Sequence, residues 1–172
     1  MTSDIEEMDR TINQFLDFAR SDGGETQQSA DLAAIAAEVA EHYRRRGKSV
    51  ATDLSGVPQL PLQALSMRRV VQNLLDNALR YGERDVSVAV RAEDGAVVLE
   101  VADRGPGIPA AEVERLKQPF TRLEVARSDK GGAGLGLAIV ERVVRAHRGT
   151  FELLAREGGG LLARIRLPSW RE

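Results

Sequence analysis

The sequence of 172 residues contains no cysteine, which excludes disulfides, thiolate metal sites and cysteine nucleophiles and suits a reducing, cytoplasmic compartment. Its formal charge is only -2, so there is no basic excess to favour a nucleic acid partner. Long apolar runs are also missing: the uncharged stretch Gly131 to Val140 contains four glycines and has about half the length of a membrane-spanning helix. With 42% hydrophobic and 29% charged residues, the composition fits one globular domain with a short appendage.

The start of the chain has a heptad pattern, because apolar residues recur in alternating steps of three and four at Ile5, Met8, Ile12, Phe15 and Ala19. This pattern favours a helix that packs against another helix, although an amphipathic helix on its own domain has the same pattern. Residues 21–29 are polar and contain glycine, which is typical of a linker. We therefore expect a helix over 1–20, a linker over 21–29 and a globular domain over 30–172.

Helical and strand-like patterns alternate in the globular part. Helices are predicted over 31–46 with Asp31 as N-cap, and over 62–81, 109–117 and 135–147. Strands are predicted over 49–54, 85–91, 96–102, 151–155 and 161–167, with hairpin turns at 93–95 and 157–160. This order predicts an α/β fold in which helices are layered on one face of the sheet.

Polar side chains gather near the end of the predicted helix 62–81. Asn73 and Asn77 lie one turn apart and face the same way, and Arg80 and Tyr81 follow. A carboxamide oxygen is a neutral ligand for a Mg²⁺ ion that already binds phosphate oxygens. Two solvated or capping asparagines would give the same pattern.

Two glycine-bearing loops complete the candidate site. Asp103 follows a strand and precedes Gly105 and Gly107, so its carboxylate could accept from an adenine amine while the glycines allow close approach of a flat base. An ordinary turn has the same composition. The run from Gly131 to Ile139 opens a helix whose free N–H groups could bind a polyphosphate, and a flexible linker is the alternative. This run is neither a Walker A loop nor a convincing Rossmann fingerprint.

Four motifs in this order resemble the N, G1, F and G2 boxes of histidine kinases. They are Asn73-Leu-Leu-Asp-Asn77-Ala-Leu-Arg80-Tyr81, Asp103-Arg-Gly105-Pro-Gly107, Gln118-Pro119-Phe120 and Gly132-Ala-Gly134-Leu-Gly136-Leu. The resemblance implies the Bergerat ATP-binding fold over residues 72–167, which is a two-layer α/β sandwich with a mixed sheet. Along nearly its full length the chain is similar to the EnvZ-like osmosensor group.

The resemblance also implies roles for single residues. Asn77 would bind Mg²⁺, Asn73 and Arg80 would hold the phosphates of ATP, Tyr81 would lie by the adenine, and Asp103 would accept from the adenine amine. The nucleotide site would further include Gly105, Gly107, Ile108, Gly132, Gly134, Leu135, Gly136 and Leu137. A mobile lid would carry Phe120, Arg122 and Arg127, where an arginine can neutralise charge on the transferred phosphoryl group.

Some residues depart from the family pattern. Lys117 replaces the frequent first phenylalanine of the F box, and Ala133 replaces a hydroxyl residue of the glycine-rich loop, so we expect a looser lid. Neither His42 nor His147 has the sequence setting of a phosphoacceptor, and both are expected to be structural. The heptad helix therefore resembles the second helix of a dimerisation hairpin, which predicts that the chain is a fragment of a homodimeric receptor of the bacterial inner membrane.

The expected function is donation of the ATP γ-phosphoryl group to a histidine outside the chain, for relay to a response regulator. The partners would be the histidine-bearing dimerisation domain and the receiver domain of that regulator. A nucleotide-driven conformational module like DNA gyrase is a second hypothesis, which the F-box element disfavours. A regulatory pseudo-kinase is a third, and the presence of Asn77 and Asp103 argues against it.

Overall fold

A computed structural model describes residues 26–82, 84–118 and 136–169, together with residues 5–6, 8–9, 12–13, 15–16 and 19 of the N-terminal helix. Its helical elements are α2 (Leu32–Arg45), α3 (Ala64–Asn77), a π-helical turn (Ala78–Gly82), a 3-10 turn (Ala110–Glu112), α4 (Val113–Leu116) and α6 (Gly136–Ala146). The strands are β1 (Gln28–Ala30), β2 (Ala51–Leu54), β3 (Leu60–Leu62), β4 (Ser87–Glu93), β5 (Ala96–Ala102), β6 (Thr150–Ala155) and β7 (Leu161–Pro168).

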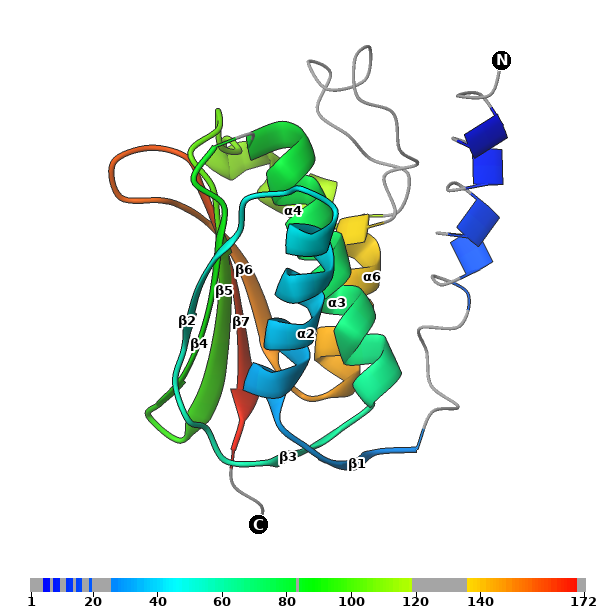
Figure 1. Cartoon of the computed structure of the whole chain (residues 1–172), viewed down its shortest axis with the longest axis vertical. Coiled ribbons are helices and arrows are strands. Elements are labelled where there is room, and N and C mark those ends of the chain that lie inside the picture. The colour runs from blue at the N-terminus through cyan, green and yellow to red at the C-terminus, as the bar shows by residue number, and fades with distance from the viewer. Residues whose placement is uncertain are drawn as a thin grey trace.

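Five strands form the main sheet in the order β2-β4-β5-β7-β6. The β2 strand is parallel to β4, and all other neighbours are antiparallel, so the sheet is mixed. Helices α2, α3 and α6 lie on one face of this sheet (Figure 1). The predicted α/β class and the layering of helices on one face are therefore confirmed.

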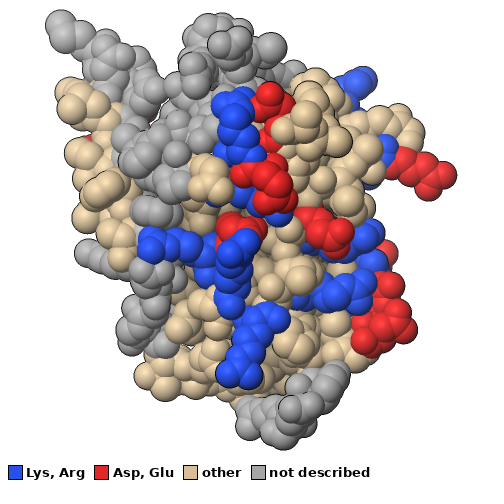
Figure 2. All heavy atoms as spheres, turned by 180° about the vertical axis from the view of Figure 1, so that it is seen from behind, with Lys and Arg blue, Asp and Glu red and all other residues tan. Residues whose placement is uncertain are grey.

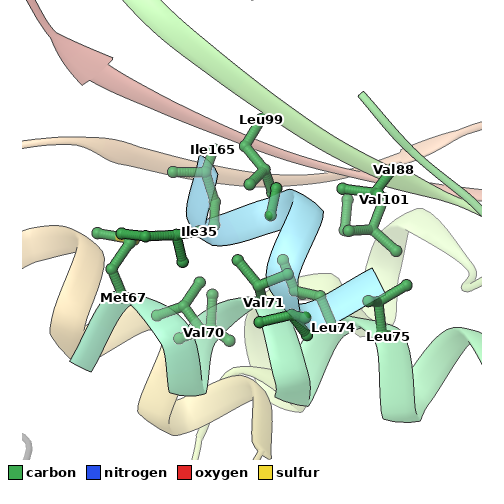
Figure 3. Packing of buried hydrophobic residues seen from close by; sticks show 14 of the residues in the cluster. Ile35, Met67, Val70, Val71, Leu74, Leu75, Val88, Leu99, Val101 and Ile165 are labelled. Carbon is green, nitrogen blue, oxygen red and sulfur yellow. The ribbon is translucent and has the colours of Figure 1, made fainter. Parts of the chain in front are cut away.

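The core lies between the sheet and these helices. Alternate strand residues point inward, and the register places Val88, Val101 and Ala163 side by side across three strands. Opposite them, Val70, Val71, Leu74 and Leu75 of α3 are buried, together with Ile35 of α2 (Figure 3). These α3 residues recur at helical spacing, which leaves Asn73 and Asn77 on another side of the helix.

Among the described residues no helix lies on the other face of the sheet (Figure 1), and the molecule seen from behind shows positive and negative side chains next to one another (Figure 2). Arg91 and Arg164, on β4 and β7, both bind Glu100 on the strand between them. Burial alone would raise the pKa of the Glu100 carboxyl, but hydrogen bonds from Arg91 and Arg164 outweigh burial and leave that pKa below its usual value. Ion pairs thus cover this face of the sheet.

A second, two-stranded sheet was not predicted. Antiparallel pairing joins Gln28–Ala30 to Leu60–Leu62, with Ser29 opposite Pro61. Strands of three residues show no alternating pattern, and a proline argues against a strand in sequence. The pairing attaches the last residues of the expected linker to the chain just before α3.

Local sequence signals correctly predicted the start of α2 and the turn between β4 and β5. Asp31 caps α2, since its Oδ1 accepts from the N–H groups of Ala33 at 2.9 Å and Ala34 at 3.3 Å. Asp94 and Gly95, with φ of 50° and 74°, form the tight turn between β4 and β5.

The described residues of the N-terminal helix expose their apolar side chains. Ile5 and Met8 are each 62% exposed, Ile12 is 51% exposed and Phe15 is 50% exposed. No helix within the described residues combines the length and apolarity that crossing a bilayer requires.

Candidate nucleotide-binding site

The start of α6 lies beside the two asparagines of α3. A Cβ atom built on Gly136, the first residue of α6, would be 3.9 Å from Cγ of Asn73 and 3.9 Å from Oδ1 of Asn77. The first N–H groups of a helix have no partner within the helix and carry partial positive charge. The structure thus brings two motifs about 60 residues apart in sequence into one place, with carboxamides and a helix N-terminus suited to an anion.

The end of the predicted helix 62–81 is not regular. The α3 helix ends at Asn77, and residues Ala78–Gly82 form a π-helical turn that includes Arg80 and Tyr81. Such turns are rare and occur frequently at functional sites. The sequence prediction of one continuous α-helix through Tyr81 is therefore wrong in its last turn.

The π-helical turn contacts the loop that follows β5 through glycine backbones. A Cβ on Gly82 would lie 2.7 Å from Oδ1 of Asp103 and closer still to its Cβ and Cγ. A Cβ on Gly105 would lie 2.5 Å from Cα of Gly82 and 2.7 Å from the carbonyl oxygen of Tyr81. Only glycine fits at both positions, so the sequence sets the approach of the Asp103 loop to α3.

The Asp103 side chain is buried and oriented by the backbone. Its Oδ1 accepts from the N–H of Gly105 at 2.8 Å and, more weakly, from the N–H of Leu161 at 3.4 Å. Both hydrogen bonds end on Oδ1, so within the described chain Oδ2 has no protein donor. A carboxylate that is 5% exposed and fixed through one oxygen can present the other oxygen to a ligand amine.

The turn between β6 and β7 supports this loop from the other side. Gly160, at φ of 108°, lies so close that a Cβ there would overlap the carbonyl oxygen of Asp103 and come within 2.8 Å of Cα of Arg104. Arg104 in turn donates to the carbonyl oxygen of Gly159 at 3.0 Å. The prediction of the site omitted this turn, although its run of three glycines, residues 158–160, was a visible signal.

The remaining predicted residues divide into two groups. Gly107, at φ of 73°, lies in the same loop as Asp103, and Ile108 and Leu137 are half-buried against the core. The other predicted positions lie outside the described residues; they are Phe120, Arg122, Arg127, Gly132, Gly134 and Leu135.

Lys117 and His147 have structural contacts. The Lys117 Nζ is buried and donates to the carbonyl oxygen of Phe151 at 2.7 Å. His147 is also buried; its Nε2 accepts from the N–H of Gln63 at 3.0 Å, and its Nδ1 lies 2.7 Å from the carbonyl oxygen of Val143. The structural role expected for His147 is confirmed.

Comparisons with known proteins decide the family. The family model for histidine kinase-, DNA gyrase B- and HSP90-like ATPases matches residues 63–171, more than half of the chain. The solved histidine kinase domain of the E. coli osmosensor EnvZ is 36% identical, with a TM-score of 0.67, and the match covers 87% of this chain and 93% of that one. The chain belongs to the sensor histidine kinases, as their ATP-binding catalytic domain.

Other relatives of this kinase domain agree. Sensor protein CutS of Streptomyces coelicolor is 37% identical over 166 residues, which cover 91% of this chain and 40% of CutS. Sensor histidine kinase GtrS of Pseudomonas aeruginosa is 37% identical over 169 residues, which cover 96% of this chain and 34% of GtrS. The structure of full-length ShkA has a TM-score of 0.78 at 27% identity over 92% of this chain and 35% of that one. The kinase domain thus spans less than half the length of these three relatives.

Proposed function

We propose that this domain binds Mg²⁺-ATP between Asp103 and the start of α6 and donates the γ-phosphoryl group to a histidine of a dimerisation domain. The observation that carries the proposal is that α3 and its π-helical turn lie against both glycine motifs at once. Gly136 lies beside Asn73 and Asn77, and Gly82 contacts Asp103. One nucleotide could therefore contact the carboxylate with its base and the helix N-terminus with its phosphates.

At the base end, Oδ2 of Asp103 would accept from the exocyclic amine of adenine. The close contact of Gly105 with Gly82 leaves no side chain between the loop and the π-helical turn. Ile108 and Leu137 would provide apolar contacts to the base, and Tyr81 would lie by it. The full-length ShkA structure, which this chain resembles, is a complex with AMPPNP, and this supports nucleotide binding by the present domain.

At the phosphate end, Asn73, Arg80 and the first N–H groups of α6 would hold the phosphates. The described residues include no group of three or more His, Cys, Asp or Glu side chains that could hold a metal ion by themselves. A single neutral ligand, Asn77, fits Mg²⁺, which takes most of its ligands from phosphate oxygens and waters. Bound there, Mg²⁺ would neutralise charge on the phosphates during transfer.

The chain has no histidine suited to accept the phosphoryl group. His147 is buried and uses both ring nitrogens in contacts with Gln63 and Val143. His42 is exposed on α2 and is followed by Tyr43, where the family motif has an acidic residue, and no proline ends the segment. The acceptor would therefore be a histidine on a separate dimerisation segment, and a response-regulator aspartate would receive the phosphoryl group afterwards.

The N-terminal helix would be part of that dimerisation segment. Ile5, Met8, Ile12 and Phe15 recur at heptad spacing and are each at least half exposed. A second helix that covers them would bury apolar surface, in agreement with a homodimeric parent protein in which residues 21–29 link the helix to the catalytic domain.

The test is a phosphotransfer assay with labelled ATP, Mg²⁺ and a separately prepared histidine-bearing dimerisation domain. We expect label on the added domain and none on this chain alone, because transfer requires an acceptor held in line with the terminal phosphate. Labelling of His42 or His147, mapped by mass spectrometry, would contradict the proposed acceptor. ATP binding without any transfer to the added domain would favour the conformational module or the pseudo-kinase.

An Asn77→Ala variant tests the metal position separately. Loss of this ligand should weaken binding of ATP with Mg²⁺ more than binding of ADP without Mg²⁺, because Asn77 would act through the metal. Calorimetry on both ligands measures the difference. Equal losses would remove Asn77 from the metal site.

A further inference from the structure

The phosphate-binding turn of α3 is held from its far side by a residue of α2. Tyr43 lies in the last turn of α2 and its ring is buried in the core, with 7% of the residue exposed. Its hydroxyl donates to Oδ1 of Asp76 at 2.6 Å and lies 3.2 Å from the carbonyl oxygen of Gln72. The Tyr43 hydroxyl thus contacts both ends of one turn of α3: the backbone carbonyl of Gln72 and the side chain of Asp76.

These contacts fall directly beside the two asparagines. Gln72 immediately precedes Asn73, and Asp76 immediately precedes Asn77. Position 76 lies about 100° around the helix from position 77, so a hydrogen bond at Asp76 resists rotation of α3 about its own axis. Rotation would carry both carboxamides away from Gly136, where an added Cβ would lie 3.9 Å from each of them.

The helix cannot fix this orientation through its own hydrogen bonds alone. The regular pattern ends at Asn77, where the N–H of Ala78 is shared between the carbonyl oxygens of Leu74 and Leu75. The π-helical turn follows at once. Beyond Asn77 the regular helix therefore gives no support, and a contact from another element adds to the core packing of α3 in setting the position of this turn.

The phenol remains a donor under physiological conditions. Burial raises the pKa of Tyr43 above its usual range, and the carboxylate of Asp76 raises it further. The positive charges of Arg46 and Arg80 act on this pKa in the opposite direction, with a smaller effect. The two acceptors of Tyr43, Asp76 and Gln72, are the sequence neighbours of the proposed phosphate-end residues Asn77 and Asn73.

We propose that Tyr43 is a positioning residue for phosphate binding and acts through Asp76 on the α3 turn that carries the asparagines. The inference rests on the proposed placement of the phosphates beside Asn73 and Asn77. Tyr43 itself does not touch the nucleotide. Its loss should therefore reduce the affinity contributed by the phosphates and leave recognition of the base unchanged.

The experiment compares two ligands, Mg²⁺-AMPPNP and adenosine, in NMR titrations of the whole chain. Tyr43→Phe removes only the hydroxyl, and we expect about three- to tenfold weaker binding of Mg²⁺-AMPPNP, the usual effect of one net hydrogen bond. Adenosine should bind Tyr43→Phe as it binds the wild type. The side-chain amide signals of Asn73 and Asn77 should shift in the ligand-free variant.

Two further variants complete the test. Asp76→Asn keeps an acceptor oxygen and should retain more AMPPNP affinity than Asp76→Ala, which should match Tyr43→Phe. Thr52→Val is the control, because Thr52 on strand β2 accepts a hydrogen bond at 3.0 Å from Arg44, the residue that follows Tyr43 on α2, and this contact does not involve α3. It should change neither affinity.

The outcomes separate the inference from the proposed function. Equal weakening of AMPPNP and adenosine in Tyr43→Phe would show a general structural role and overturn the inference. Unchanged AMPPNP binding with unshifted amide signals would overturn it as well. A wild-type chain that binds neither ligand would contradict the nucleotide site itself, and the inference with it.

Discussion

Substitution of Gly82 by alanine tests the contact between the π-helical turn and the Asp103 loop. The added Cβ would lie 2.7 Å from Oδ1 of Asp103 and closer to its Cβ and Cγ, distances that real side chains do not adopt. Asp103 cannot simply rotate away, because Oδ1 is held by the N–H groups of Gly105 and Leu161. Either the carboxylate leaves these donors or the π-helical turn shifts.

Both responses have a cost. Overpacking of a well-packed site costs about 1 to 3 kcal/mol of folding stability, and replacing glycine recovers only about 0.4 to 1 kcal/mol through the unfolded state. A displaced carboxylate would also lose the proposed hydrogen bond from the adenine amine, worth about 1.5 to 3 kcal/mol because the acceptor is charged. We expect Gly82→Ala to be destabilised by about 1 to 2 kcal/mol and to bind ATP at least about tenfold more weakly.

Urea unfolding measures the stability and calorimetry measures the affinity. Gly56→Ala is the matched control, because no heavy atom lies within 4 Å of a Cβ built at Gly56. The control should retain full ATP affinity and change stability by less than about 0.5 kcal/mol. A Gly82→Ala protein with the stability and affinity of the wild type would refute the close contact on which the site is built.

Two predictions concern stability. Glu100→Gln should lower the free energy of unfolding by about 1 to 2 kcal/mol at pH 7, because the charged acceptor between Arg91 and Arg164 is gone. The folded-state pKa of Glu100 is lowered, so the stability advantage of the wild type should decrease once the pH falls below the ordinary glutamate pKa of about 4.3 and disappear as the pH falls through the folded-state pKa. An equal stability difference at pH 7 and pH 3 in urea unfolding would contradict this. His147→Phe leaves the buried N–H of Gln63 without its acceptor and should lower the free energy of unfolding by about 1 to 3 kcal/mol. An unchanged free energy of unfolding would mean that this hydrogen bond is not formed.

The sequence predicted the elements that follow local rules. The five strands of the main sheet and the layer of helices follow from the alternation of apolar residues, and the ends of several elements follow from caps and turns such as Asp31 and Asp94–Gly95. The motifs around Asn73 and Asp103 were visible because they combine residue type with fixed spacing. Their approach through Gly82 and Gly105 is consistent with that prediction.

The features that the sequence did not reveal all depend on contacts between distant segments. The pairing of β1 with β3 joins strands of three residues, one of which contains Pro61. The π-helical turn departs from α3 where tertiary contacts override helix propensity. The support of Asp103 by Gly160 and the bond from Tyr43 to Asp76 join residues more than 30 positions apart, and residue type alone does not identify such pairs.

The central claim is that Asp103 accepts a hydrogen bond from the adenine base. A comparison of the wild type and Asp103→Asn with two nucleotides tests it most directly. Calorimetry would measure ATP and ITP, whose base carries an oxygen in place of the amine, against both proteins. We predict that Asp103→Asn weakens ATP binding by about 1 to 3 kcal/mol, because a donor then faces the amine, and that it weakens ITP binding much less or improves it. A folded Asp103→Asn variant that binds ATP as tightly as the wild type, or loses ATP and ITP equally, would contradict the placement of the base.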